Sequence, residues 1–302
     1  MKHLTTKTLA LLDLDDAARR RTIDSQKWVP YPRVLELNSR LERLLNLPDS
    51  FRFEGLSVYG AANVGKTLSL RRFDKQHPFV SLEDKGEVRK SVVYMSAPRK
   101  ADEKQFYREL LKAMGADGLF SSTTSLLEDQ INKLLSHLQV RMLIIDEFHH
   151  FLVGSYNQTQ ALFNEIKRIG DQLHIAIVTV GLPAGHTGIE RDDQLRTRLK
   201  EFEISPFERG DDYSRLLISF ESLLPLHKPS NLNNKLIATH ILDITQGVMG
   251  EISTLLKLAA QRAIDNKVEC ITLKIINELI RDKTYIKPPK ILTTAVISAN
   301  DL

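Results

Sequence analysis

Apolar residues are distributed in two different ways along this chain, and the change occurs near residue 206. Between residues 50 and 205, short apolar runs of strand length alternate with longer segments in which apolar residues recur at helical spacing. The runs of strand length are 56–59, 91–95, 142–146, 174–180 and 202–204. The segments with helical spacing are 68–73, 104–114, 126–138 and 151–173. Because strands that alternate with helices form parallel sheets, we predict an α/β domain built on a five-stranded, doubly wound parallel sheet.

Beyond Pro206 the helical spacing continues and no further run of strand length occurs. Helices are predicted at 211–224, 233–245, 251–265 and 273–282. The chain therefore divides into an N-terminal helical extension (1–48), an α/β domain (49–206), a small helical domain (207–286) and a C-terminal tail (287–302). The tail contains Pro288-Pro289 and is either disordered or a docking segment for a partner.

Composition limits the class of protein without selecting one. The chain has 302 residues, 42% of them apolar, which is enough for a core in one large or two modest domains. Its one cysteine, Cys270, excludes an internal disulfide framework and fits a reducing compartment. No apolar stretch has the length of a membrane span and no apolar signal core follows the N-terminus, so we expect a cytoplasmic protein without a membrane partner. The net charge of +4 permits a nucleic-acid partner but does not require one.

Residues 60–67 read G-A-A-N-V-G-K-T and satisfy the phosphate-binding loop pattern G-x-x-x-x-G-K-[ST]. The loop lies between a predicted strand and a predicted helix, as this motif requires, although a chance match in a glycine-containing loop is the alternative. Gly60 and Gly65 let backbone N–H groups surround phosphates, Lys66 would contact the β- and γ-phosphates, and Thr67 would hold Mg²⁺. The residues predicted to bind the nucleotide here are Gly60, Ala61, Asn63, Val64, Gly65, Lys66, Thr67 and Leu68.

A second motif, Met-Leu-Ile-Ile-Asp-Glu at 142–147, is an apolar run that ends in two adjacent carboxylates. Parallel sheets place ligands at the carboxyl ends of their strands, so this pair is expected at the same edge as the loop. Asp146 would then support Mg²⁺, and Glu147 would polarise the attacking water. A core strand that ends in an acidic turn is the alternative for the run taken alone. Together, the loop and the pair predict an ATPase whose cofactors are ATP and Mg²⁺.

His149 and His150 directly follow this acidic pair. Adjacent histidines lack the spacing that is usual for zinc ligands, so we expect no zinc site from them. His149 is instead expected to adjust Glu147 by hydrogen bonding.

Longer segments resemble one family of ATPases. A phosphate-loop α/β core followed by a helical lid is similar to the AAA+ superfamily. Within that superfamily the chain resembles the TniB/TnsC family, the ATP-dependent regulators of multi-component DNA transposons. The segments that carry the resemblance are W-V-P-Y-P-R (28–33), the loop at 60–67 and M-L-I-I-D-E-F-H-H-F (142–151). The likeness continues through V-T-V-G-L-P (178–183), R-D-D-Q-L-R-T-R-L (191–199) and G-V-M-G-E-I-S-T-L-L-K-L-A-A (247–260). It covers nearly the whole chain and implies a bacterial, DNA-associated protein with an AAA+ fold.

The resemblance implies further catalytic residues beside Glu147. Thr179, at the end of a predicted strand, would sense the γ-phosphate, with a β-branched core residue as the alternative. Arg198 would reach the γ-phosphate of a neighbouring subunit, where a guanidinium neutralises developing charge. Arg191 and Arg196 are rivals for this role.

The resemblance also implies that Tyr31 and Pro32 lie against the adenine. The alternative is that their cluster only packs against the rest of the protein. One departure concerns the lid: many AAA+ lids supply a second sensor arginine, whereas this one offers Glu251 and Lys257. Sensing of the nucleotide by the lid is therefore not expected to follow the common pattern.

Family members are similar in assembling as rings or filaments around duplex DNA and touching its phosphate backbone. Two loops are candidates for these contacts, 97–101 with Arg99 and Lys100, followed by Lys104, and 120–124 with Thr123. The alternatives are ordinary exposed loop charges for the two cations, and the cap of the next helix for Thr123. Contacts of this kind position a protein on DNA without reading the base sequence.

The resemblance thus implies a homo-oligomer that assembles on double-stranded target DNA and links a target-selector protein or RNA-guided complex to a transposase. Hydrolysis of ATP would then dismantle the assembly. The alternative function is an initiator-like or chaperone-like AAA+ ATPase that acts on a protein client.

Overall fold

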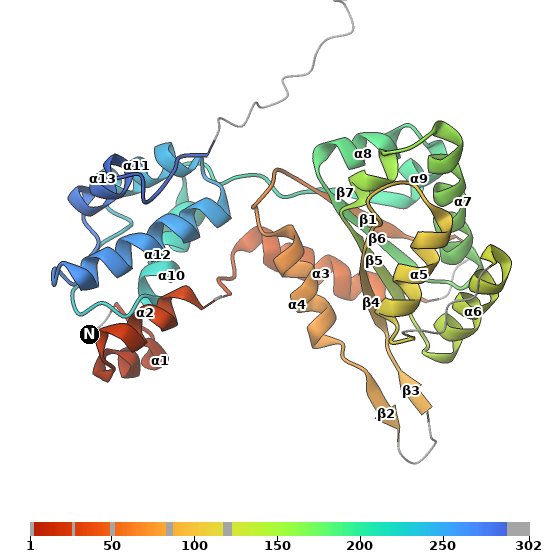
Figure 1. Cartoon of the computed structure of the whole chain (residues 1–302), viewed down its shortest axis with the longest axis horizontal. Coiled ribbons are helices and arrows are strands. Elements are labelled where there is room, and N and C mark those ends of the chain that lie inside the picture. Colours follow the sequence, from red (N-terminus) through yellow and green to blue (C-terminus); the bar gives the residue numbers. More distant parts are fainter. Residues whose placement is uncertain (1–2, 26–27, 49–51, 83–86, 117–122, 289–302) are drawn as a thin grey trace, which may run out of the picture. The chain divides into compact units, whose positions relative to one another are not determined.

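The computed structural model describes residues 3–25, 28–48, 52–82, 87–116 and 123–288. The chain folds into two compact units (Figure 1). The α/β unit comprises Arg33–Ser205, and the helical unit combines the residues up to Pro32 with those from Pro206 onward.

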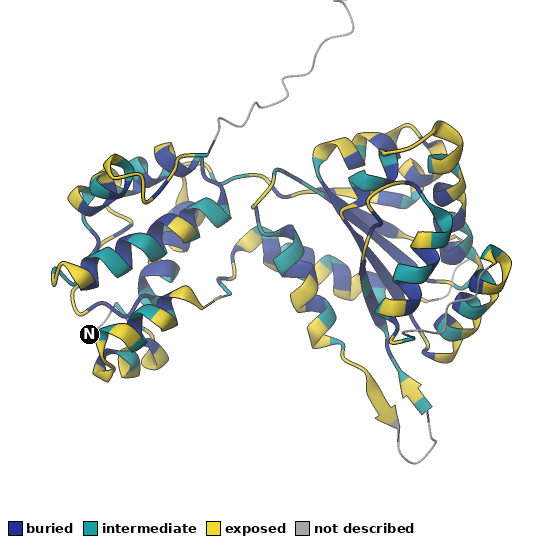
Figure 2. Ribbon diagram, in the orientation of Figure 1, coloured by how far each residue is buried: buried dark blue, intermediate teal, exposed yellow. Residues whose placement is uncertain are grey.

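A parallel sheet of five strands, counted over the described residues, forms the centre of the α/β unit, in the order β4-β5-β6-β1-β7. The strands are β1 Gly55–Tyr59, β4 Val92–Ser96, β5 Met142–Asp146, β6 Ala176–Gly181 and β7 Leu199–Glu203. Every residue of β5 and β6 is buried, as the dark strands of Figure 2 show. Continuous apolar runs are typical of strands that helices cover on both faces. The sheet confirms the predicted α/β fold class.

Helices connect these strands and supply the other half of the core. They are α3 Pro32–Leu45, α4 Lys66–Gln76, α5 Glu103–Ala113, α6 Thr124–His137, α7 Tyr156–Gln172, α8 Pro183–Glu190 and α9 Asp193–Arg198. Phe106 of α5, Leu127 of α6 and Ile166 of α7 are fully buried in one apolar cluster with the sheet. The apolar positions that predicted these helices are therefore the positions that face the core.

The structure adds elements that the apolar pattern did not predict. The segment 151–173 is not one helix, because a short 3₁₀ helix, η3 (Phe148–Leu152), precedes α7. The short helices α8 and α9 carry too few apolar positions to show periodicity. Strands β2 (Val80–Leu82) and β3 (Glu87–Arg89) form an antiparallel pair, and each is too short for a recognisable alternation.

The helical unit contains the predicted C-terminal helices, here α10 Asp211–Leu223, α11 Lys235–Thr245, α12 Met249–Asp265 and α13 Leu273–Arg281. It also contains α1 Thr6–Leu9, η1 Ala10–Asp13 and α2 Asp16–Asp24 from the start of the chain. Figure 1 shows α2 beside α12, and the two helices are in contact. In this unit Arg19 of α2 forms a two-pronged ion pair with Glu269, with both N–O distances at 2.8 Å.

The parallel sheet decides which loops share an edge. The loops that follow Tyr59, Ser96 and Asp146 all leave the carboxyl edge of the sheet. Arg198 immediately precedes β7 and therefore lies at the opposite, amino edge. In the described part of the chain, no helix combines the length and the apolar character that a bilayer crossing requires.

Candidate nucleotide-binding site

At two positions of the loop between β1 and α4, the backbone requires glycine. Gly60 packs on the backbone of Ile204, whose carbonyl oxygen would lie 2.2 Å from a Cβ atom at position 60. Gly65 has a φ of 98°, in the left-handed region that favours glycine, and α4 begins at the next residue. The first backbone N–H groups of α4 therefore open onto the loop, an arrangement that binds anions.

Lys66 extends over this loop. Its side chain is buried, and Nζ donates to the carbonyl oxygens of Gly60 at 2.8 Å and of Ala61 at 2.7 Å. Burial lowers the pKa of the ammonium below its ordinary value, while the carboxylates of Asp146 and Glu147 oppose that shift. Because an ammonium binds charged phosphate oxygens more strongly than neutral carbonyls, this position suits a polyphosphate.

The Asp146 carboxylate at the end of β5 is only 2% exposed. Thr67 and Tyr94 donate their hydroxyl groups to its Oδ2 atom at 2.8 and 2.5 Å, and the backbone N–H of Glu147 donates to Oδ1 at 2.8 Å. Burial and the bond to Asp146 raise the pKa of Tyr94, so the phenol remains a donor. Since Mg²⁺ prefers oxygen ligands, the adjoining oxygens of Thr67 and Asp146 fit this ion.

Tyr94 is a site residue that the sequence motifs did not reveal. It lies on β4 level with Ile144 of β5, and its ring contacts Arg71 of α4, whose Nε donates to the phenol oxygen at 3.3 Å. The signal available in the sequence was a polar hydroxyl inside an otherwise apolar strand. Its partner Asp146 lies 52 positions away, so only the strand register identifies the pair.

Glu147 follows β5 in a left-handed backbone conformation, with a φ of 56°. This turn leaves its side chain 48% exposed, and Oε2 lies 3.4 Å from Nδ1 of His149. Burial, with the neighbouring His150 as the second cause, lowers the pKa of His149. Near pH 7 the His149 imidazole is therefore neutral, and Glu147 is an accessible carboxylate that can contact a water molecule.

Thr179 lies inside β6, level with Ile145 and Ser57. Successive side chains of a strand face opposite sides of the sheet, so this row faces away from the row of Asp146. The Thr179 side chain is buried, lines a small space together with His186 of α8, and its hydroxyl has no hydrogen-bond partner among the described residues. The structure does not bring it to the Asp146 carboxylate, and its sensor role stays a prediction.

Arg198 lies at the amino edge of the sheet. It pairs with Asp171 at 2.8 Å, lies over the ring of Phe53, and its side chain is 13% exposed. Its two rivals, Arg191 and Arg196, are exposed. Arg198 is at the edge opposite the phosphate loop of its own subunit, and its role as a trans-acting arginine stays a prediction.

Tyr31 and Pro32 lie at the end of the first stretch of the helical unit. Tyr31 is buried, with its ring edge against Phe207 at 4.9 Å between ring centres, and Pro32 is the first residue of α3. Contact of these two residues with adenine stays a prediction.

The residues predicted to contact DNA lie in the α/β unit. Arg99 and Lys100 are exposed in the loop after β4, and Lys104 is half-buried in the first turn of α5. Thr123 is exposed and is the cap residue of α6, while residues 120–122 of that predicted loop lie outside the described residues. Arg99 and Lys100 therefore share the carboxyl edge of the sheet with the phosphate loop.

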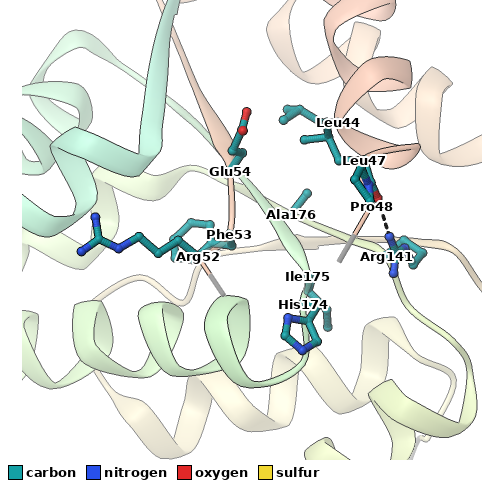
Figure 3. A pocket seen from close by; sticks show the side chains of 10 residues that line it. All are labelled: Leu44, Leu47, Pro48, Arg52, Phe53, Glu54, Arg141, His174, Ile175 and Ala176. Atoms are coloured by element: carbon teal, nitrogen blue, oxygen red, sulfur yellow. Dashed lines mark hydrogen bonds between the residues drawn. The ribbon is translucent and has the colours of Figure 1, made fainter. Parts of the chain in front are cut away.

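A separate cavity of about 220 Å³ opens at the amino edge of the sheet (Figure 3). It is lined by Leu44, Leu47, Pro48, Arg52, Phe53, Glu54, Arg141, His174, Ile175 and Ala176. Arg141 donates to the carbonyl oxygen of Leu47 across one side, at 2.7 Å. Because the amino edge is opposite the edge that carries Asp146, this cavity is not part of the nucleotide site.

Comparison with known proteins adds a family and a fold. The family model for the bacterial TniB protein matches residues 19–209. Among solved structures, Cdc6p of Pyrobaculum aerophilum aligns with a TM-score of 0.62 and 16% identity over 89% of this chain and 71% of its own. The ORC1 protein of Aeropyrum pernix, in complex with DNA, aligns with a TM-score of 0.60 and 18% identity over 88% of this chain and 69% of its own. The Walker-type ATPase PABY2304 of Pyrococcus abyssi aligns with a TM-score of 0.56 and 16% identity over 87% of this chain and 78% of its own.

At such identities these likenesses concern the fold alone, and they confirm the α/β phosphate-loop ATPase fold with its C-terminal helices. A comparison with curated proteins found no match.

Proposed function

The chain belongs to the TniB family, and from this premise we propose that it is an ATP-dependent regulator of DNA transposition. ATP binding drives its oligomerisation on double-stranded target DNA, where it links a target-selector protein or RNA-guided complex to a transposase. Hydrolysis then dismantles the assembly. The observation that carries this proposal is the hydrogen bond that joins Thr67 of the phosphate loop to Asp146, at 2.8 Å, in a chain of this family.

The groups needed for ATP hydrolysis are held by different elements at one edge of the sheet. Lys66 and the N-terminal N–H groups of α4 bind the phosphates, and Thr67 and Asp146 hold Mg²⁺, which neutralises charge on the phosphate oxygens. Glu147, beside the neutral imidazole of His149, orients the attacking water and accepts its proton.

A guanidinium from the neighbouring subunit completes the site in this proposal. Arg198 remains our first candidate, although it must leave Asp171 to act in trans. Arg191 and Arg196 are the rivals, since both are exposed, and Arg196 pairs with an exposed neighbour in sequence, Asp193. Substitution of the trans-acting residue by alanine removes ATP turnover in the assembled state while ATP binding by the single subunit persists.

DNA contact is assigned to Arg99, Lys100, Lys104 and Thr123. The two exposed cations after β4 suit phosphate oxygens, which position a protein without reading sequence. The ORC1 protein of similar fold was solved in complex with DNA, which supports the proposal that this chain binds DNA.

The decisive experiment measures binding to a fluorescent DNA duplex with ATP, with a non-hydrolysable analogue and without nucleotide, across a salt series. Binding that requires the triphosphate, ignores sequence and falls with salt is expected. Replacing both Arg99 and Lys100 by alanine lowers the salt slope by roughly two, about one for each lost phosphate contact. The matched control, Lys133→Ala, removes an exposed cation from α6 and leaves the slope unchanged.

Two substitutions separate binding of ATP from its hydrolysis. Lys66→Ala is expected to abolish ATP-dependent assembly on DNA, because the ammonium that binds the β- and γ-phosphates is lost. Glu147→Gln keeps the shape of the side chain without its base, so the assembly forms and persists. Light scattering and DNA retention after ATP addition check both outcomes, and a Glu147→Gln protein that neither assembles nor persists refutes the proposed switch.

Binding to DNA without nucleotide dependence, or no binding at low salt, favours the alternative function. In that case the chain is an initiator-like or chaperone-like AAA+ ATPase whose client is a protein.

A further inference from the structure

Three side chains with metal-binding atoms meet directly after β5. Glu147, His149 and His150 each offer one ligand atom, and these atoms all lie within 4.8 Å of one another. Adjacent histidines lack the spacing that is usual for zinc ligands. Here Glu147 is the residue before the 3₁₀ helix η3 and has a left-handed backbone, with a φ of 56°, and both histidines lie inside that helix.

One distance in this cluster matches that between two ligands of a single ion, and all three ligand atoms lie within 4.8 Å of one another. Ligand atoms bound to Zn²⁺ at about 2.1 Å in a tetrahedron lie roughly 3.4 Å apart. The separation between Oε2 of Glu147 and Nδ1 of His149 is 3.4 Å, and the rings of His149 and His150 have their centres 4.5 Å apart.

Neither histidine uses Nδ1 for another purpose in the described part of the chain. Both Nδ1 atoms are buried, and neither has a hydrogen-bond partner there. A buried nitrogen without a partner is unusual, because such groups are normally hydrogen-bonded or bound to an ion. An ion at the cluster would use this available bonding capacity.

We propose that Glu147, His149 and His150 bind one divalent ion of the zinc type, and that the bound ion withdraws Glu147 from ATP hydrolysis. Two imidazole nitrogens and one carboxylate oxygen form a ligand set that suits Zn²⁺, whereas Mg²⁺ prefers the oxygen atoms of Thr67 and Asp146. The two ions therefore occupy different places. Zn²⁺ coordination blocks the carboxylate that orients water but leaves the phosphate loop intact, so ATP binding continues without turnover. The inhibitory consequence rests on the proposed function of Glu147, whereas the binding of the ion does not.

Zn²⁺ binding is measured on the full chain without nucleotide, by competition with a chromophoric chelator. One equivalent of Zn²⁺ is expected, and Mg²⁺ in excess does not displace it. His150→Ala weakens binding at least about tenfold, since even the loss of a group that hydrogen-bonds to a metal ligand has that effect. His137→Ala, an exposed histidine on α6, leaves the affinity unchanged.

Circular dichroism and thermal melting establish that each variant is folded before its affinity is compared. Glu147→Gln, which preserves side-chain size, provides a second test and is also expected to weaken binding. The proposed site is refuted if the unsubstituted protein does not bind one equivalent of Zn²⁺ tightly. It is also refuted if the folded His150→Ala protein binds Zn²⁺ with the same affinity as the unsubstituted protein.

The inhibitory part is tested by ATP turnover at saturating Mg²⁺ with and without Zn²⁺, taken as a ratio for each protein. Zn²⁺ is expected to suppress turnover of the unsubstituted chain at least about tenfold and to suppress His150→Ala less at the same concentration. Unchanged turnover with the site filled overturns the inhibition. A chain that binds Zn²⁺ but never hydrolyses ATP contradicts the proposed ATPase function and leaves the ion site standing.

Discussion

At the scale of single residues, the Asp146 carboxylate connects parts of the chain that are distant in sequence. Its Oδ2 atom accepts hydrogen bonds from Thr67 and from Tyr94, which lie 79 and 52 positions away. Thr67 is also the residue proposed to hold Mg²⁺, so its hydroxyl has two roles. Tyr94 has no such second role, and Arg71 fixes its phenol from the other side. We infer that Tyr94 orients the carboxylate.

Tyr94→Phe removes this hydroxyl and keeps the ring. We expect the Mg²⁺ concentration needed for nucleotide binding to rise by about tenfold, the usual scale for loss of a partner behind a metal ligand. A fluorescent nucleotide titrated with Mg²⁺ measures this directly. Tyr59→Phe is the matched control, because its hydroxyl contacts Glu201. Equal Mg²⁺ dependence in the two variants contradicts the positioning role.

At the scale of elements, the connection from β5 to α7 shapes the site. The chain leaves Asp146, turns through Glu147 and η3, and starts α7 only at Tyr156. Ser155 caps α7 with a reciprocal pair of hydrogen bonds to Gln158. This capping box starts the helix where the apolar pattern alone places no boundary.

Ser155→Ala is expected to lower the free energy of unfolding by about 1 kcal/mol, because backbone N–H groups at the start of α7 lose their acceptor. Urea denaturation followed by circular dichroism measures this loss. Ser136→Ala replaces an exposed serine near the end of α6 and is expected to change stability by less than about 0.5 kcal/mol. Similar losses in both variants show that the cap is unimportant.

At the scale of the whole molecule, the beginning and the end of the chain build one unit. Residues up to Pro32 fold with those from Pro206 onward. Arg19 is buried, pairs with Glu269 and Asp16, and donates to the carbonyl of Pro225 at 3.2 Å. Its neighbour Arg20 makes an exposed pair with Asp265. Two arginines of one basic run therefore have different structural roles.

Arg19→Ala leaves Glu269 without its main partner, and we expect a loss of about 3 kcal/mol in the stability of the helical unit. The single tryptophan, Trp28, belongs to this unit, so its fluorescence during urea unfolding reports it. Arg20→Ala is the control and is expected to cost less than about 1 kcal/mol, as is usual for exposed pairs. A larger loss for Arg20→Ala than for Arg19→Ala contradicts this assignment.

The same pair predicts a dependence on pH. The hydrogen bonds from Arg19 are the main cause that holds the pKa of Glu269 below its ordinary value of 4.5. Because the folded pKa is the lower one, the stabilisation is complete above pH 4.5 and is lost as the pH falls through the folded value. The Trp28 unfolding midpoints of the unsubstituted protein and of Arg19→Ala should therefore converge in acid. A difference that stays constant across that range refutes the linkage.

Much of the α/β unit was predictable because its signals are local. Strands β5 and β6 are almost entirely apolar, and the longer connecting helices, such as α5, show one apolar face. The phosphate loop needs particular residues at fixed spacing, which is why Gly60 to Thr67 are recognisable in sequence. The short helices α8 and α9 and the pair β2–β3 were missed, because elements of a few residues carry too little periodicity.

The sequence by itself determined the fold class, the phosphate loop, the Asp146–Glu147 pair and the family, since each depends on neighbouring residues or a continuous pattern. Only the tertiary structure decided that Tyr94 contacts Asp146, that Thr179 faces the other side of the sheet, and that Arg19 is buried. It also decided that Glu147, His149 and His150 gather around one point. These outcomes depend on strand register, on the backbone turn after β5 and on contacts between distant segments. Such relations arise only when the chain packs, because no local residue pattern encodes the distance between two side chains.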